Sequence, residues 1–414
     1  MPSLRCIGFL LLAGSFATPV AYGQALSLSQ AVQRSLTTNA ALRAANQTII
    51  GTERRAELTG LAPAWTVGAD IENAGGTGPY AGLQGSETTL RLGRVIELGG
   101  KLDARRAVGA AEVARSRLGL DQTRLTLATE TTMRFVEVLA DQARIEVAAR
   151  DLALARELTA TVAHWVTVGR SPESDLALMQ IRQEQADIEV EHAEHELAAA
   201  RVSLAALWGA EEADFAAASG DLFTLPAVPA FEQFVARLAD NPAQRALVLD
   251  ARTSQARERL ASAMSRPDIT AHVGVRRMGI SHDTALIAGV TIPLGSARRS
   301  ALSAAQAQAE TNALQAQAEA SATERRQQLF TVYQELLHAR TAFEAHRDRM
   351  IPKAESALAL TRKGFAAGRF SFVSLAQAQR TLLDLRTAQI DAALRYHTLL
   401  AEIERMTATT GVTP

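Results

Sequence analysis

The chain has 414 residues, with 43 basic and 44 acidic side chains. A net charge of −1 argues against a strongly basic protein that binds nucleic acid. Hydrophobic residues make up 47% of the sequence, but aromatic residues only 5%. Because a large globular core normally uses more aromatic side chains, this alanine- and leucine-rich composition favours long, closely packed helices.

The first 23 residues have the pattern of a signal peptide. Arg5 precedes an apolar run of about a dozen residues, which is too short to span a bilayer. Small residues precede Gln24, where we expect the mature chain to start. The alternative is an N-terminal membrane anchor. The only cysteine, Cys6, lies in this segment, so we expect neither a disulfide nor a cysteine metal ligand in the mature protein.

An internal repeat organises the rest of the chain. The sequences around Asn39 and Gly169 resemble those around Asn241 and Gly368, at an offset of roughly two hundred residues. Such self-similarity predicts two copies of one unit, residues 24–220 and 231–414. They are joined by a linker, residues 221–230, whose prolines interrupt the helical pattern.

Each copy predicts a helix, a β-hairpin, a very long helix, a short turn and a final helix. Ser29 is the expected N-cap of the first helix, and Pro352 is expected to kink the long helix of the second copy. A helix of about 65 residues is about 100 Å long, so the two shorter helices, stacked end to end, should run antiparallel beside it. The predicted helices are Ser29–Leu61, Leu102–Val166 and Pro172–Leu207, then Phe231–Met264, Arg298–Phe365 and Phe372–Met406.

Four segments predict strands, in hairpins at about residues 64–97 and 267–294. Apolar and polar side chains alternate in each, as where Trp65 and Val67 flank Thr66. Each is about ten residues long, which is enough for a tilted strand to cross a bilayer. Four strands cannot close a barrel, and an open edge in lipid leaves backbone groups unpaired. We therefore expect several copies to share one barrel, with twelve strands from three chains. A soluble rod with a small, half-wet sheet is the alternative.

These features resemble the TolC family of outer membrane efflux channels. The resemblance rests on the duplication, on "VIELGGKLDAR" and "TIPLGSARRS", and on two Gly-Arg turns. The "ELGGK" motif is most similar to the CzcC-type subgroup, which serves heavy-metal efflux. The resemblance implies a mainly α protein with a small β part. Its long antiparallel helical hairpins would form a trimeric α-barrel, capped by a shared 12-stranded transmembrane β-barrel with four strands per chain.

The same resemblance implies a location and partners. The channel would lie in the outer membrane of a Gram-negative bacterium, with a large periplasmic portion. It would be a homotrimer that works with a periplasmic adaptor and an inner membrane pump of the resistance-nodulation-division (RND) type. Its cargo would be divalent heavy-metal cations, carried passively. Two alternatives are an exit duct for organic compounds or drugs, and a non-channel periplasmic helical rod or adhesin.

The two Gly-Arg turns, residues 167–171 and 366–371, are the candidate functional site. A glycine after a helix favours a left-handed C-terminal cap, and Ser171 and Ser371 are expected to cap the next helices. The resemblance makes these tips the docking surface for the adaptor, and Arg170 and Arg369 hypothetical gate-locking residues. The alternative is a pair of ordinary helix turns without a partner. The candidate docking residues are Val168, Gly169, Arg170, Ser171, Ala367, Gly368, Arg369 and Ser371.

One further cluster suggests metal chemistry. His192 and His195 are three residues apart on a predicted helix, and with Glu191 they could hold a divalent cation. A solvated helical face is the simpler interpretation. The sequence contains no GxSxG, HExxH or phosphate-binding glycine loop, so we expect neither an enzyme nor a cofactor.

Overall fold

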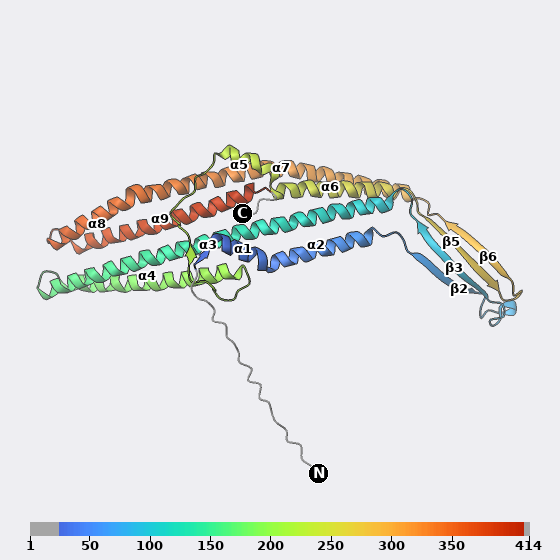
Figure 1. Ribbon diagram of the computed structural model, residues 1–414, viewed down its shortest axis with the longest axis horizontal. Helices are drawn as coiled ribbons and strands as arrows, with labels where there is room; N and C mark the ends of the chain where they lie inside the picture. The colour runs from blue at the N-terminus through green and yellow to red at the C-terminus, as the bar shows by residue number, and fades with distance from the viewer. Residues whose placement is uncertain (1–24, 410–414) are drawn as a thin grey trace, which may run out of the picture.

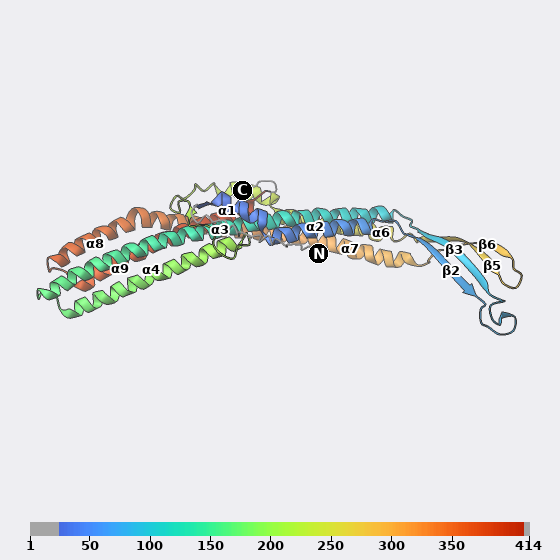
Figure 2. The same ribbon diagram turned by 60° about the horizontal axis from the view of Figure 1, so that its bottom comes forward.

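The computed structural model describes residues 25–409 and shows a long, gently curved molecule. Helices fill most of its length and a four-stranded sheet forms one end (Figures 1 and 2). The predicted class, mainly α with a small β part, is confirmed. The signal peptide predicted over residues 1–23 lies outside the described residues.

Nine α-helices are present in the described part of the chain. Helix α3 is 67 residues long, which corresponds to about 100 Å. Within residues 25–409, no helix is long and apolar enough to cross a membrane. The helices are α1 (Leu28–Thr38), α2 (Ala40–Thr59), α3 (Lys101–Thr167), α4 (Glu173–Ala206), α5 (Phe231–Arg237), α6 (Pro242–Ala263), α7 (Ser296–Ala345), α8 (Ile351–Ala366) and α9 (Phe372–Thr407).

The long helices lie side by side in a curved row. Towards the sheet the order is α2, α3, α6 and α7, and towards the opposite end it is α4, α3, α9 and α8 (Figures 1 and 2). Helix α3 therefore packs on helices of both repeats. The row has two edges: one consists of α2 followed by α4, and the other consists of α7 followed by α8.

The first helix of each repeat is broken by an asparagine, which the sequence analysis did not predict. The Asn39 side chain accepts a hydrogen bond from Ala41 N at 2.7 Å and donates one to Leu207 O at 2.7 Å. Asn241 repeats this arrangement, accepting from Ala243 N at 2.8 Å and donating to Met406 O at 2.8 Å. Each amide thus caps the following helix and ties it to the carbonyl end of the last helix of its repeat.

The N-cap of α1 and the interruption before α8 both differ in detail from the sequence prediction. The N-cap of α1 is Ser27, not Ser29, because Ser27 and Gln30 form a reciprocal capping box. The long helix of the second repeat is interrupted, as Pro352 suggested, but by a π-helical turn over His346–Met350. Pro352 follows at the start of α8, where its missing N–H is tolerated.

The strands β2 (Trp65–Glu72), β3 (Glu87–Ile96), β5 (Ile269–Met278) and β6 (Thr284–Thr291) form one antiparallel sheet in the order β2-β3-β5-β6. Pairing between β3 and β5 joins the two hairpins, whereas β2 and β6 are the edge strands of the sheet. Strands β1 (Leu26–Ser27) and β4 (Ala218–Ser219) form a separate short parallel pair near the middle of the molecule.

The register of this sheet separates its side chains into two faces. Val67, Leu92 and Val273 lie in one row across three strands, and all three are exposed. Leu286 on the edge strand is 88% exposed. A continuous apolar face therefore lies open on one side of the sheet.

The other face of the sheet is polar. Asp70 pairs with Arg91, and Arg276 pairs with Glu72 at 2.8 Å and with Glu87 at 3.0 Å. Because Arg276 reaches across three strands, it links the second hairpin to the first.

Candidate functional site

The two tip turns have the same backbone. Gly169 and Gly368 both have φ of 69°, in the left-handed region that glycine adopts without strain. Arg170 N donates to Trp165 O at 2.8 Å and Gly169 N to Val166 O at 3.0 Å, which together form a Schellman motif. After α8, Arg369 N and Gly368 N make the equivalent bonds to Gly364 O and Phe365 O, at 2.8 and 2.9 Å.

The side chains around the two turns differ. After α3, the Arg170 guanidinium lies over the Trp165 ring, 5.9 Å from its centroid. After α8 the position equivalent to Trp165 is Gly364, and the Phe370 ring covers it so closely that an added Cβ would clash with the ring. The second turn is therefore closed by apolar packing, whereas the first has a cation–π contact.

The two tips pack against each other. The Trp165 and Phe365 rings are 4.8 Å apart, and a buried cluster containing Val162, Phe372 and Leu375 lies behind them. A cleft of about 290 Å³ between the tips is lined by four of the eight predicted docking residues. The residues brought together there are Arg170, Ser171, Gly368 and Ser371. The other four, Val168, Ala367, Arg369 and Gly169, are exposed on the same tips.

One of the two predicted serine caps is present. Ser371 accepts a hydrogen bond from Ser374 N at 3.3 Å and caps α9. Ser171 does not cap α4; its hydroxyl donates to the Asp175 carboxylate at 2.8 Å. The N-cap of α4 is Pro172, which has no side-chain oxygen to offer.

An ion pair connects the repeats beside the tips, but it involves neither Arg170 nor Arg369. Arg362 of α8 pairs with Glu157 of α3. These residues are 205 positions apart, so no local signal in the sequence could have paired them. Beside the tips, Arg362 therefore makes the kind of charged contact that the gate hypothesis gave to Arg170 and Arg369.

The histidine cluster does not converge on one point. His192 pairs with Glu196 at 3.3 Å, and His195 pairs with Glu191 at 3.6 Å, so each imidazole is directed to a different glutamate. Within residues 25–409, no group of three or more potential ligands has the geometry to hold a metal ion. The metal role of His192, His195 and Glu191 stays a prediction, and the geometry offers it no support.

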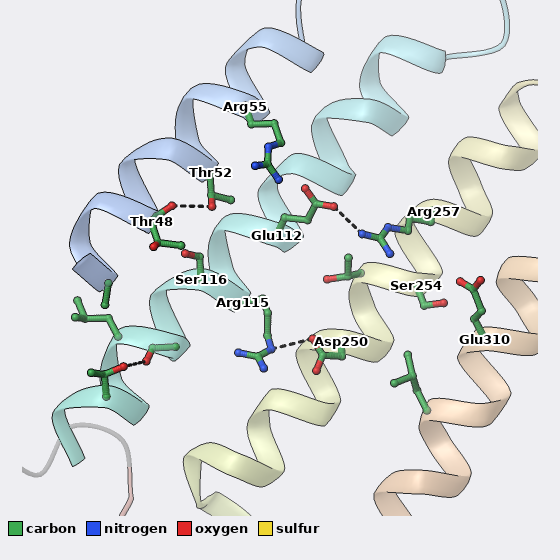
Figure 3. A pocket seen from close by; sticks show the side chains of 16 residues that line it. Thr48, Thr52, Arg55, Glu112, Arg115, Ser116, Asp250, Ser254, Arg257 and Glu310 are labelled. Carbon is green, nitrogen blue, oxygen red and sulfur yellow. Dashed lines mark hydrogen bonds and ion pairs between the residues drawn. The ribbon is translucent and has the colours of Figure 1, made fainter. Parts of the chain in front are cut away.

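A polar hollow of about 690 Å³ lies across α2, α3, α6 and α7 (Figure 3). Two ion pairs cross it, Arg115 with Asp250 at 2.8 Å and Arg257 with Glu112 at 2.8 Å. Six of the lining residues carry hydroxyl groups, Ser116 among them (Figure 3). Such a surface interacts well with water and with charged solutes.

A second hollow lies nearer the tips, over the same face of α3. The α3 residues of the two hollows, including Glu112, Gly119, Arg144 and Asp151, recur at near multiples of 3.6 residues. On the opposite face of α3, Gln142 exchanges two hydrogen bonds with Ala218 beside the inter-repeat linker. The row of helices thus has one polar, open face and one face that the linker crosses.

The "ELGGK" segment joins the sheet to the helices. Gly99 and Gly100 have φ of 81° and 73°, and this left-handed pair turns the chain from β3 into α3. Lys101 is only 4% exposed and pairs with Asp268 of the second repeat at 2.6 Å. The motif therefore fixes the two repeats to each other where the strands begin, and Arg105 completes the joint by binding Glu97.

The chain matches the family model described as "Outer membrane efflux protein" over residues 69–210 and 236–409. It belongs to that family. The protein is thus an outer membrane efflux protein of Gram-negative bacteria with a large periplasmic part, as the sequence analysis predicted.

Relatives and solved structures agree with this family. The chain is 27% identical over 321 residues to the cobalt-zinc-cadmium resistance protein CzcC of Cupriavidus metallidurans, covering 77% of this chain and 76% of that protein. It is 28% identical over 314 residues to the nickel-cobalt-cadmium resistance protein NccC of Alcaligenes xylosoxydans xylosoxydans, covering 73% and 69%. The predicted resemblance to a CzcC-like channel is confirmed.

Two crystal structures of channels share the fold. The MtrE outer membrane channel of Neisseria gonorrhoeae superimposes with a TM-score of 0.74 at 17% identity, covering 92% of this chain and 89% of that one. CusC, described as undergoing transmembrane channel formation, superimposes with a TM-score of 0.72 at 16% identity, covering 94% and 96%.

Proposed function

We propose that three copies of this chain form an outer membrane channel that is the exit duct of a tripartite efflux system. The observation that carries the proposal is the incomplete sheet. Edge strands β2 and β6 have eight residues each, and the apolar face between them is exposed. In lipid such edges must be paired, and strands of equal length suit one another.

The geometry of the edges supports closure by identical copies. Strands β2 and β6 lie on opposite edges of the sheet, and they continue into the two edges of the helical row, α2 and α7. A head-to-tail contact of β2 with the β6 of the next copy therefore repeats around a ring. Three chains of four strands give twelve strands, above the smallest closed barrels of about eight.

The polar face of the helical row would line the duct. Its two hollows carry charged and hydroxyl side chains, whereas the linker packs on the opposite face. A channel for ions needs a wet, polar wall, and a wall with paired charges does not trap its cargo.

Divalent heavy-metal cations are the proposed cargo. The support comes from the relatives CzcC and NccC, which are resistance proteins for cobalt, zinc, cadmium and nickel. Transport through the duct is passive, and its energy would come from an RND-type pump in the inner membrane. A duct for organic compounds or drugs is the second candidate, because MtrE and CusC share this fold at 17% and 16% identity and the fold alone does not fix the cargo.

A periplasmic adaptor is the proposed partner at the tips. The tips expose apolar side chains, Val168, Phe370 and Val373, beside the cleft between the repeats. Exposed apolar groups at the end of a helical rod are suited to bind the helices of another protein.

Three measurements test the proposal. Native mass spectrometry in detergent should give a trimer, and the trimer should conduct ions across a planar lipid bilayer. Deleting the gene should lower the tolerated concentration of cobalt, zinc, cadmium or nickel several-fold, and the intact gene should restore it. A protein that is monomeric and does not conduct would refute the channel. Sensitivity to organic compounds alone would favour the second candidate.

A further inference from the structure

Helix α4 carries a second heptad stripe on the face that points away from α3. On the inner face Met179, Ala186 and Ala193 are seven residues apart and buried against α3. The outer stripe is exposed although it includes large apolar residues; Ile188 is 63% exposed. A stripe with a 3.5-residue period is the pattern of a helix that packs on a second helix. The outer stripe consists of Ile181, Glu184, Ile188, Glu191 and His195.

Helix α8, on the opposite edge of the row, carries a matching stripe. Its inner face buries Ile351, Ala354 and Phe365. The outer face is exposed, and Leu360 there is 63% exposed. In one chain α4 and α8 are separated by α3 and α9, so these two outer stripes lie on opposite edges of the row (Figures 1 and 2). The outer stripe consists of Met350, the last residue of the π-helical turn, and of Lys353, Ala357 and Leu360 in α8.

The charges of the two edges are opposite in sign. Residues 173–196, which include the outer stripe of α4, contain eight acidic side chains and one arginine. Residues 347–369 contain six lysines and arginines and two acidic side chains. Among residues 25–409, neither Glu184 nor Lys353 takes part in any of the ion pairs found. Opposite charges on complementary edges favour contact between them and fix its direction.

The two stripes also match in height above the tips. Glu184 lies fifteen residues after Gly169, and Lys353 lies fifteen before Gly368. Ile188 and Met350 are nineteen and eighteen residues from the same glycines. The tips are level because Trp165 contacts Phe365. In a ring of identical copies, each pair would therefore lie within about one helical rise of 1.5 Å.

We propose that α4 of one copy packs antiparallel on α8 of the next copy, in the register that places Glu184 beside Lys353 and Ile188 beside Met350. Ile181 and Ala357, twelve and eleven residues from the same glycines, form the apolar contact nearer the tips. We call this contact between α4 and α8 the seam. It rests on the proposed trimer and adds to that proposal the contact that closes the helical part of the ring. Glu191 and His195 continue the outer stripe level with the π-helical turn and the end of α7, so the acidic stretch that suggested a metal site serves assembly.

Cysteine cross-linking tests the register. The chain's only cysteine is Cys6, so one chain can carry Ile188→Cys and Met350→Cys together. Oxidation of the purified trimer should give covalent dimers and trimers on a denaturing gel. A link within one chain is excluded, because α4 and α8 lie on opposite edges. In the matched control, Ile188→Cys with Leu360→Cys, the two positions differ in height by about 16 Å, so the yield should be several-fold lower.

Charge reversal in the chain that carries Ile188→Cys and Met350→Cys tests the proposed ion pair between Glu184 and Lys353. Glu184→Lys or Lys353→Glu alone should lower the cross-linking yield several-fold at low salt, and the two together should restore it. High salt should shrink the effect, because surface charges are screened. Glu212→Lys, which makes the same charge change on an exposed loop after α4, should leave the yield unchanged.

The outcomes separate the seam from the channel. A conducting trimer without links at Ile188 and Met350, or with more links in the control pair, overturns the seam and leaves the channel intact. If the cysteine at position 188 is freely modified in the purified trimer and protected only by an adaptor, the adaptor occupies this face and the seam is wrong. A protein that is never trimeric refutes the proposed function itself.

Discussion

The turn after α3 and the turn after α8 share a backbone and differ in their surroundings. Both place glycine at φ of 69° and close the same pair of hydrogen bonds. Arg170 covers Trp165 in the first, whereas Phe370 covers Gly364 in the second. The backbone needs of a helix turn do not change after a duplication, but its side chains adapt to different neighbours.

The asparagines of the two repeats also share a backbone role and differ in their surroundings. Asn39 and Asn241 make equivalent hydrogen bonds to the following helix and to the end of the last helix. Asn241 is 6% exposed and donates to a second carbonyl, Arg405 O, at 3.0 Å. We therefore expect the second repeat to depend more on its asparagine than the first does.

The largest effect should come from Asn241→Ala. It removes a helix cap and leaves buried carbonyls without a donor, so we expect a loss of about 2–3 kcal/mol in the free energy of unfolding. Asn39→Ala should cost about 1–2 kcal/mol, and the control Asn46→Ala, on the exposed face of α2, less than about 0.5 kcal/mol. Thermal unfolding followed by circular dichroism measures all three. Equal losses at positions 39 and 241 would show that burial does not distinguish the repeats.

Gly169→Ala and Gly368→Ala should each cost about 1 kcal/mol, because alanine is strained at φ of 69°. The added Cβ meets nothing within 4 Å at either position, so the two losses should be equal. Gly51→Ala, in open space inside α2, should instead stabilise the helix by about 0.5–1 kcal/mol. Unequal losses at the two tips would mean that their surroundings, and not the shared backbone, set the cost.

Arg362→Ala should change stability by less than about 1 kcal/mol, because its ion pair with Glu157 is exposed. It removes the charged contact between the repeats beside the tips, so the tips should spread more easily and single-channel conductance should rise. Arg369→Ala is the matched control and should leave conductance unchanged. If Arg369→Ala raised conductance and Arg362→Ala did not, the gate residue would be the arginine of the Gly-Arg turn.

The smallest effect should be a pH dependence at the linker. Burial lowers the pKa of His397, whose Nε2 lies 2.9 Å from Leu222 O. The neutral form is thus favoured in the folded protein, and stability should fall as pH drops below about 6.5, the usual value for histidine. His397→Gln keeps a donor but cannot titrate, so its melting temperature should vary less between pH 7 and pH 5 than that of the unchanged protein. An identical pH dependence in both proteins would exclude His397 as the cause.

The sequence by itself determined the repeat, the kinds of element and the positions of the turns. Helical and strand periodicity, and the left-handed preference of Gly169 and Gly368, depend on residues close along the chain. The same reasoning found the strands but missed the breaks at Asn39 and Asn241. Each asparagine caps locally, but its second contact is with a carbonyl about 165 residues away.

Only the tertiary structure decided which distant segments meet. It joined the hairpins through β3 and β5, paired Lys101 with Asp268 and Arg362 with Glu157, and placed α4 and α8 on opposite edges. These contacts depend on how the long helices pack side by side, and many sequences with the same periodicity could pack differently. Local chemistry therefore fixes the elements, whereas burial and charge pairing between remote residues fix their arrangement.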